Sequence, residues 1–367
     1  MRDGWVEDNL GQYIQINTGK RDVNASSEFG AYPFFTCARE TYRIDEAAFD
    51  GESVLVAGNG DLNVKYYDGK FNAYQRTYVL KSVDKTVLDN RFLYIYMQTY
   101  VDYLRSETRG TVIQYLKKDQ FTDAKIKLPP LPEQKRIVDL ISTVDSYIEA
   151  LRQQLESAKV SRNAVLHELL TAGGDGWAET PLVEAAEVLD RFRKPVNSTE
   201  REKRKGNVPY YGANGQTGWI DDFLFNEELV LLGEDAIDFL DPNARKAYLI
   251  SGPSWVNNHA HILRVLPERA VPYLLAEALN RVDYSQYVSF GTRSKLTQSS
   301  MNGIKILLPP LPEQKRIVDL ISTADSYIDA LEGQVNSSTS LRSGLLSDLL
   351  SGNHEIPSSY DQLIGAA

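Results

Sequence analysis

The chain of 367 residues is poor in several features that mark particular classes of protein. Its one cysteine, Cys37, excludes an internal disulfide framework and a cysteine-based zinc site. Its apolar runs, such as residues 229–232, are far shorter than the roughly 20 residues of a membrane span. Its first residues lack the basic and apolar segments of a signal peptide. We therefore expect a cytoplasmic protein with no membrane partner.

An excess of positive charge is also missing. The chain has 40 Lys and Arg residues against 50 Asp and Glu residues, for a formal net charge of −10. This balance argues against a generally basic nucleic-acid binder. The apolar and charged fractions are ordinary, so the chain can bury real cores, and its length predicts about two domains of roughly 150 residues each.

Catalytic signatures are missing as well. The Gly-Lys pair at 19–20 lacks the upstream glycine and the following Ser or Thr of a phosphate-binding loop. No (Asp/Asn)-Pro-Pro-(Tyr/Phe) segment of an amino-methyltransferase occurs, and the Glu-x-Lys string at 133–135 lies at a helix start without an upstream aspartate. His259 and His261 are expected to share one face of a strand, but a zinc site needs further ligands. We expect no catalytic residue and no metal site in this chain.

What the chain does contain is an internal repeat. The string LPPLPEQKRIVDLIST at 128–143 recurs unchanged at 308–323, which is 180 residues later. Across the 24 positions that begin at 128 and at 308, only Val144/Ala324 and Glu149/Asp329 differ. The segments between the copies differ much more, although an Asp-Gly-Trp opens each of them. The predicted organisation is a variable domain (1–127), a repeated segment (128–173), a second variable domain (174–307), a second repeated segment (308–353) and a tail (354–367).

Each copy of the repeat has the pattern of a long helix with a coiled-coil seam. A proline suits the first turn of a helix, and apolar residues then follow in steps of four and three for about five heptads. Gly173 and Gly174 end the first copy, and Arg162 and Arg342 interrupt the seam at equivalent places. The seam residues that we single out are Ile137, Ile141, Ile148, Leu151 and Leu155 in the first copy and Ile317, Ile321, Ile328, Leu331 and Val335 in the second.

Two such helices of roughly 38 residues each are the simplest partners for one another. We expect them to pair antiparallel and to give the molecule a pseudo-twofold axis, with the C-terminus near the N-terminus. The alternative is two separate amphipathic helices, each packed on its own domain. A seam does not require identical outward residues such as Tyr147 and Tyr327, so two equal outward surfaces suggest two copies of one partner. A recent duplication is the alternative explanation of the identity.

The doubled LPPLPEQKRI helix closely resembles the specificity subunit of Type I restriction–modification systems. Each copy follows a variable domain, and segments such as PYYGANGQTGWID at 209–221 strengthen the resemblance. The fold class that it implies is mixed α/β (α+β), with two target recognition domains separated by an antiparallel coiled coil. In that family each domain reads one half of a split DNA sequence, and the long helices form the spacer and dock two methyltransferase (modification) subunits.

The resemblance also implies where the chemistry resides. The partner subunits use S-adenosylmethionine, ATP and magnesium, and this chain is expected to hold no cofactor and to be non-catalytic. The expected partners are double-stranded DNA, two modification subunits and, in a complete system, restriction (translocase and nuclease) subunits. The alternatives left open are a coiled-coil protein adaptor without DNA binding and a specificity subunit of a methylation-only defence system.

Candidate DNA contacts are gathered in a few loops, which is how an acidic chain can still contact phosphates. Seven of the sixteen residues at 191–206 are Lys or Arg. Arg suits a guanine edge, and Asn or Gln suits an adenine edge. Because the two domains differ in sequence, the DNA target is expected to be asymmetric. The candidate DNA-binding residues are Lys20, Arg21, Arg39, Arg76, Arg109, Arg191, Arg193, Lys194, Arg201, Lys203, Arg204, Lys205, Asn214, Gln216, Arg293 and Lys295.

Overall fold

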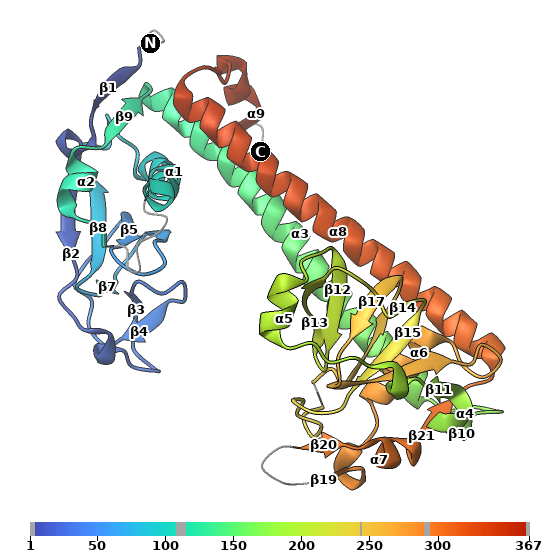
Figure 1. Cartoon of the computed structure of the whole chain (residues 1–367). Helices are drawn as coiled ribbons and strands as arrows, with labels where there is room; N and C mark the ends of the chain where they lie inside the picture. The colour runs from blue at the N-terminus through green and yellow to red at the C-terminus, as the bar shows by residue number, and fades with distance from the viewer. Residues whose placement is uncertain (1–3, 108–114, 243, 290–293, 365–367) are drawn as a thin grey trace. The chain divides into compact units, whose positions relative to one another are not determined.

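The computed structural model of the chain (Figure 1) describes residues 4–107, 115–242, 244–289 and 294–364. Arg109 and Arg293, two of the predicted DNA contacts, lie outside these residues. The chain divides into two compact units: Met1–Gln153 together with Leu331–Ala367 forms unit 1, and Gln154–Ala330 forms unit 2. Each unit is described separately below.

Unit 1 is built on a four-stranded antiparallel sheet. Its strand order is β2 (Ile14–Thr18), β8 (Thr77–Ser82), β5 (Ser53–Ala57) and β6 (Val64–Tyr67). A smaller sheet has the order β4 (Tyr42–Ile44), β3 (Tyr32–Phe35) and β7 (Asn72–Ala73), and β3 pairs with β7 in parallel. A two-stranded sheet joins β1 (Val6–Asn9) to β9 (Lys125–Leu128). The helices are α1 (Asn90–Glu107) and α2 (Lys118–Thr122), with short 3-10 turns at Leu10–Gln12 and Val23–Ala25.

The central strand β5 is buried on both faces. Because successive side chains of a strand point to opposite faces, its residues divide between two cores. Val54 and Val56 join the large core that contains α1, whereas Leu55 joins a smaller core with Phe35 and Phe71. Strand β5 therefore forms the centre of a three-layer domain, with α1 on one side and the small sheet on the other.

Unit 2 repeats this topology. Its main sheet has the order β11 (Ala186–Val188), β18 (Ala260–Val265), β15 (Leu229–Gly233) and β16 (Ala247–Ile250). The second sheet has the order β13 (Gly215–Ile220), β12 (Val208–Gly212), β17 (Pro253–Val256) and β14 (Phe225–Asn226), with β12 and β17 parallel. Two-stranded sheets pair β10 (Ala178–Pro181) with β21 (Lys305–Leu308), and β19 (Val288–Ser289) with β20 (Lys295–Leu296).

The helices of unit 2 include a counterpart of α1. They are α4 (Leu182–Ala185), α5 (Ser198–Lys203), α6 (Pro272–Asn280) and α7 (Gln298–Asn302), with 3-10 turns at Asp190–Phe192 and Tyr284–Gln286. Helix α6 covers the main sheet as α1 does in unit 1, because Val230 and Leu232 of β15 share a core with its Leu275 and Leu279. The opposite face of β15 packs on the second sheet.

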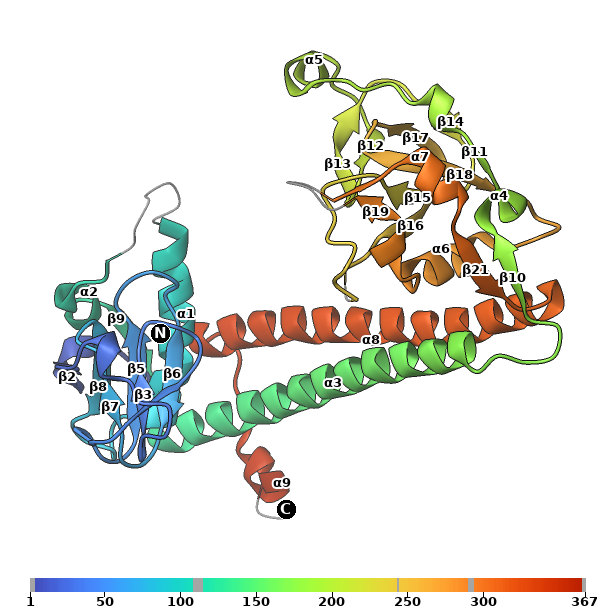
Figure 2. The same ribbon diagram turned by 90° about the horizontal axis from the view of Figure 1, so that it is seen from below.

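The repeated segments form two long helices, α3 (Leu131–Thr171) and α8 (Leu311–Ser351), of 41 residues each. Figures 1 and 2 show the two helices side by side. In unit 1, Ile137 and Ile141 of α3 share a core with Leu346 and Leu349 of α8. In unit 2, Leu166 and Leu170 of α3 pack with Ile317 and Ile321 of α8. The start of α3 packs on the end of α8, and the end of α3 packs on the start of α8, so the predicted antiparallel pairing is confirmed.

The chain after α8 returns to the N-terminal strand of unit 1. Gly352 lies against the Trp5 ring, and Ile356 is buried in the same core as Trp5. A 3-10 turn at Ser358–Tyr360 and a short helix, α9 (Asp361–Ile364), follow. Residues 352–356 thus lie close to Trp5 within unit 1, in agreement with the predicted return of the second helix to the first domain. None of the helices in the described ranges has the length and apolar character that crossing a membrane requires.

Candidate nucleic-acid and partner interfaces

The predicted seam residues lie where α3 and α8 face one another. All ten are buried or half-buried, and Ile137, Ile317 and Ile321 are each only 1% exposed. Because residues in steps of four and three lie on one stripe of a helix, this burial follows from the spacing in the sequence. The seam holds apolar residues away from water along both halves of the helix pair.

The two arginines that interrupt the seam are paired across it. In unit 2, Arg162 Nε donates to Asp325 at 2.9 Å and its guanidinium also contacts the Tyr273 hydroxyl. In unit 1, Arg342 Nη2 donates to Asp145 at 2.9 Å and to Gln98 at 2.9 Å. The hydrogen bonds to Asp145 raise the pKa of Arg342, so its charge is held at any physiological pH. These pairs satisfy a half-buried charge that would otherwise weaken the seam.

A glutamine in each copy of the repeat ties the long helix to the domain before it. Gln134 accepts from the Asp89 backbone N–H at 2.9 Å and donates to the carbonyls of Val87 and Pro129. Gln314 makes the same three bonds, to Val271, Arg269 and Pro309, at 2.9–3.1 Å. Sequence reasoning missed this role and assigned the string only to a helix start. The signal available was a polar residue repeated unchanged beside the seam.

The Asp-Gly-Trp landmarks have a related explanation. Gly4 and Gly176 both adopt the left-handed region, with φ of +81° and +82°. An added Cβ would meet the ring of Pro130 or Pro310, at 3.2 and 3.0 Å. The glycines therefore allow the start of each domain to pass closely over the prolines of the repeated string. Part of the repeat's sequence identity thus serves contacts within each unit.

The basic segment at 191–206 separates into inward and outward residues. Arg204 donates to Asp221 at 2.9 Å and lies over the Trp255 ring, and Arg201 lies over the Tyr210 ring, each 4.6 Å from the ring centroid. Arg193 pairs with Asp190 at 3.4 Å and with Glu234. Arg201 and Arg204 hold the segment on the second sheet of unit 2, whereas Arg193 ties it to the main sheet, where it also donates to the Ala260 carbonyl of β18 at 3.1 Å. Asn197 caps helix α5 by accepting from the Glu200 N–H at 2.8 Å.

The remaining basic residues of this segment are exposed. Lys194, Lys203 and Lys205 face solvent, and Arg191 is exposed beside Glu187 at 3.6 Å. Lysine presents a mobile point charge, which suits contact with DNA phosphates rather than with base edges. Lys295 is half exposed and pairs with Glu234 at 2.9 Å, so the Glu234 carboxylate contacts both Arg193 and Lys295.

The two predicted base-reading amides lie on the hairpin of β12 and β13. Asn214 donates to the Ala236 carbonyl at 2.9 Å, and Gln216 donates to the Gly218 carbonyl at 3.1 Å. Both side chains are exposed, and Asn214 lines a cleft of about 750 Å³. The cleft also contains Asn257 and carboxylates, so it offers hydrogen-bond donors and acceptors of the kind that base edges require. Its other lining residues are Gly212, Ala213, Thr217, Asp235, Ala236, Ile237, Asp238, His259 and Ser294.

The two histidines do not share a strand face, and that prediction is wrong. His259 lies in the turn before β18, where Nδ1 is 2.8 Å from Asp235. His261 lies within β18 and is buried, with Nδ1 2.5 Å from Asp190 and Nε2 2.9 Å from the Leu296 carbonyl. The strand begins at Ala260, so His259 lies just before it. Within the described ranges, no cluster of His, Cys, Asp and Glu has the arrangement of a metal site.

The predicted contacts of unit 1 are more dispersed. Lys20 is exposed in the loop after β2, and Arg21 beside it pairs with Glu46. Arg39 pairs with Asp61 at 2.6 Å, and Arg76 lies over the Tyr115 ring, 5.5 Å from the centroid. The structure thus brings together a basic surface in unit 2 but spreads the candidates of unit 1 over several loops.

Comparison with known proteins gives one consistent result. The family described as Type I restriction modification DNA specificity domain matches residues 2–159 and again 174–338. The Type I restriction enzyme EcoDI specificity subunit of Escherichia coli is 26% identical over 389 residues, covering 94% of this chain and 87% of that protein. A putative type I specificity subunit of Haemophilus influenzae is 32% identical over 156 residues, which is 42% of this chain and 39% of that protein.

Solved structures agree on the fold. The S subunit of a Type I restriction–modification system from M. genitalium has a TM-score of 0.59 at 18% identity, covering 94% of this chain and 96% of that one. A chain from a structure on complex assembly and conformational transition of the type I R-M system has a TM-score of 0.61 at 17% identity, with coverage of 95% and 98%. At these identities the likeness concerns the fold.

Proposed function

Because this chain belongs to the Type I restriction–modification DNA specificity family, we propose that it is the sequence-specific DNA recognition subunit of such a complex. It reads an asymmetric bipartite DNA target through its two recognition domains, and it docks two methyltransferase subunits on the spacer helices. It acts in the cytoplasm, where both DNA and partner subunits are available.

One observation carries this proposal. The same domain topology is built twice, with the same parallel pairing of β3 with β7 and of β12 with β17, on two unlike sequences. Each domain is tied by an identical glutamine to an identical helix start. The contacts between each domain and its long helix are thus the same, while the two domain sequences differ. This arrangement suits a protein that recognises two different DNA half-sites.

The proposed division of DNA contacts follows residue chemistry. The exposed lysines 194, 203 and 205 contact phosphates, which fixes the domain on the duplex without reading sequence. Asn214 and Gln216 lie on a hairpin whose polar cleft has the size and donor–acceptor content for base edges. Arg193, Arg201 and Arg204 position these groups, because they are already engaged within the chain.

The chemistry of modification belongs to the partners in this proposal. S-adenosylmethionine is bound by the modification subunits, and ATP and magnesium are used by the restriction subunits where these exist. This chain contributes no catalytic residue and no metal ligand.

The test is to co-express the chain with a candidate modification subunit, an adenine methyltransferase, and to purify the complex. The complex should methylate genomic DNA in an S-adenosylmethionine-dependent way, at one split motif with two unlike halves. Replacing residues 177–304 by the equivalent domain of another family member should change one half of the motif and leave the other unchanged. A stable complex that methylates no split motif would indicate a protein adaptor, and absence of a complex would refute the proposal.

The spacer gives a second test. Inserting seven residues in α3 and seven in α8 lengthens the helix pair by about 10 Å, at 1.5 Å per residue. The unread gap of the methylated motif should grow by roughly three base pairs, since B-DNA rises 3.4 Å per pair. Both half-sites should stay the same. A changed half-site, or an unchanged gap, would contradict the role of the helices as a spacer.

A further inference from the structure

The two copies of the repeat start have different neighbours. In unit 1, the C-terminal tail (residues 353–364) covers the first turns of α3. Arg136 donates two hydrogen bonds to the Asp361 carboxylate, at 2.7 and 2.6 Å, and Tyr360 donates to Asp139 at 2.8 Å. Ile356 of the tail is buried in the core of the unit. The tail therefore presents a carboxylate, a phenol and an aliphatic side chain to this face.

The residues under the tail are largely shielded from solvent. The Arg136 side chain is only 13% exposed, and Leu140 packs half-buried against the core that contains Ile356. Glu133 is buried and accepts a hydrogen bond from the Trp5 indole at 3.0 Å.

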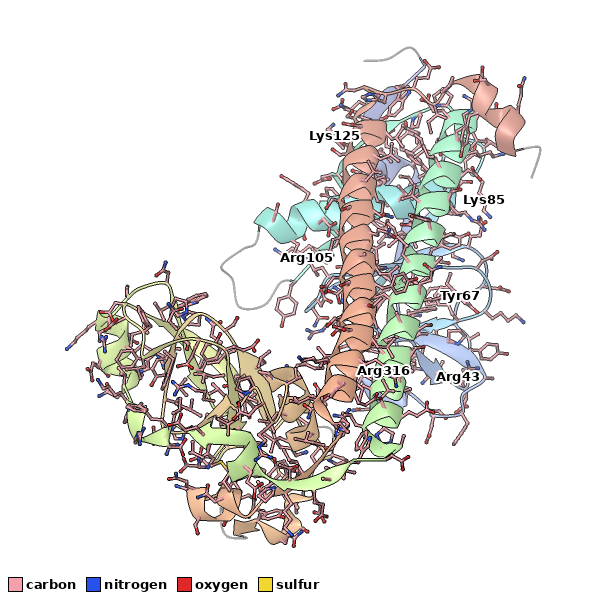
Figure 3. All side chains as sticks on the ribbon, turned by 90° about the vertical axis from the view of Figure 1, so that its right-hand side faces the viewer. Arg43, Tyr67, Lys85, Arg105, Lys125 and Arg316 are labelled. Atoms are coloured by element: carbon pink, nitrogen blue, oxygen red, sulfur yellow. The ribbon has the colours of Figure 1, made fainter. Side chains whose placement is uncertain are left out.

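In unit 2 the same residues are uncovered. Arg316, labelled on α8 in Figure 3, is 74% exposed and donates to its own neighbour Glu313 at 3.0 and 2.8 Å. Asp319 is exposed, and Leu320 is 52% exposed. This is the sequence that binds a tail in unit 1, so its capacity to bind such a segment is retained. What differs is that, among the described residues, no tail lies on Arg316 and Leu320.

We propose that the face formed by Glu313, Arg316, Asp319 and Leu320 docks a segment of the modification subunit that carries an aliphatic residue, a hydroxyl and a carboxylate. This deepens the proposed function and rests on it. The chemistry of the occupant follows from the tail, which meets the same side chains in unit 1. A second copy of this chain is a poor source, because its tail is held in its own unit by Asp361 and Ile356.

Docking implies a local exchange of partners. The incoming carboxylate takes the Arg316 guanidinium from Glu313, so one two-bond Arg–carboxylate pair is exchanged for another of the kind that Asp361 forms with Arg136. Glu313 is then free to turn to Trp177, the counterpart of Trp5, which is half-buried in the uncovered state. The first repeat, by contrast, is open to a partner only on faces that the tail leaves bare, such as that of Tyr147.

The first experiment titrates the full chain with a labelled peptide of the tail sequence, NHEIPSSYDQLIGAA, and follows its anisotropy. We expect one binding site with a dissociation constant on the order of 0.1–1 mM, in the range of a small contact. Arg316→Ala should weaken binding at least tenfold, and so should Asp361→Asn in the peptide, because each removes the charged pair. Arg152→Ala, which changes an exposed arginine of α3 elsewhere, is the matched control and should have no effect. Absence of binding, or equal binding to Arg316→Ala, would overturn the proposal.

The second experiment identifies the occupant. Saturating peptide should lower the amount of modification subunit that co-purifies with the chain, and Arg316→Ala should lower it without peptide. A peptide that binds yet leaves assembly unchanged would overturn the assignment to the modification subunit. Peptide binding does not involve DNA. If the chain binds the peptide but the complex methylates no split motif, the result counts against the proposed function alone.

Discussion

The two copies of the repeat have one sequence and two sets of neighbours. Gln134 and Gln314 make the same three hydrogen bonds, whereas Arg136 binds the tail and Arg316 binds its own helix. The difference shows that sequence identity fixes the contacts a helix makes with its own domain. It does not fix what lies on the opposite face, because that depends on chain supplied from elsewhere.

The recognition domains show the reverse relation. Their topology is the same, but their surfaces are not: the connection from β11 to β12 carries seven basic and three acidic residues, and the one from β2 to β3 carries two of each. Here the shared element is the fold, and the variable element is the set of side chains on this connection.

The largest effect is expected from Ile148→Asp. Ile148 is 3% exposed in the seam, so the change buries an unpaired carboxylate at a cost of several kcal/mol. Thermal unfolding should shift strongly, and the modification subunit should no longer co-purify. Tyr147→Asp, at the neighbouring 56% exposed position, should leave the unfolding temperature nearly unchanged. Ile328→Asp should cost less than Ile148→Asp, because its position is only half-buried. If Ile148→Asp unfolded at the wild-type temperature, the interpretation of Ile148 as a buried seam residue would be wrong.

Next are Gln134→Ala and Gln314→Ala. Each leaves one backbone N–H and two carbonyls without their side-chain partner, a loss of roughly 2–3 kcal/mol of unfolding free energy. The two effects should be equal within error in chemical denaturation, because the two sets of bonds are the same. A difference of more than about 1 kcal/mol would mean that the two joints are not equivalent after all.

A smaller effect is expected on DNA binding. Replacing Lys203 and Lys205 by alanine should weaken binding of the assembled complex by about tenfold at moderate salt. The slope of log K against log salt should fall by roughly 0.9 for each lost phosphate contact. The loss should be similar for cognate and non-cognate DNA. Lys20→Ala in unit 1 should weaken DNA binding less, because it removes only one lysine. If the slope of log K against log salt is unchanged in the double variant, the phosphate contacts lie elsewhere.

The smallest effect concerns the tail. Arg136→Ala should speed proteolytic cleavage after Tyr360, because the Asp361 carboxylate loses its partner, and Arg316→Ala should not. The hydrogen bonds from Arg136 lower the pKa of Asp361. The ion pair should therefore protect the tail at neutral and mildly acidic pH, and this protection should fade only as pH falls through that lowered pKa. Equal cleavage rates of the two variants would contradict the docked tail.

Much of the fold follows from the sequence because it depends on local pattern. Both long helices follow from the 3.5-residue spacing of their apolar residues, whereas the fully buried strands β5 and β15 appear in the sequence only as short apolar runs. The second copy of the string indicates that the two helices pair with each other. Burial of alternating or heptad positions is a property that the chain encodes residue by residue.

The sites were less predictable, because they depend on which partner each polar residue finds. Arg193 and Lys194 are neighbours in one basic run, yet the first is drawn inward by Glu234, 41 residues away, and the second faces solvent. The docking of Ile356 and Asp361 on unit 1 could not be inferred from a tail without pattern. The identity of Gln134 and Gln314 pointed to importance, but only the fold shows that their partners lie in their own domain.

The discontinuity of unit 1 has a consequence for how the chain folds during synthesis. Unit 2 is one stretch, Gln154–Ala330, and its helix halves are both present once the ribosome has passed residue 330. Unit 1 needs Leu331–Ala367, which are made after unit 2, to cover the seam on Ile137 and Ile141 and to seat Ile356 beside Trp5. The domain that precedes unit 2 is therefore made before it but completed after it. A message truncated just after the codon for Ala330 should release a chain whose second unit is finished and whose first unit still exposes apolar helix, which is a substrate for chaperones and proteases.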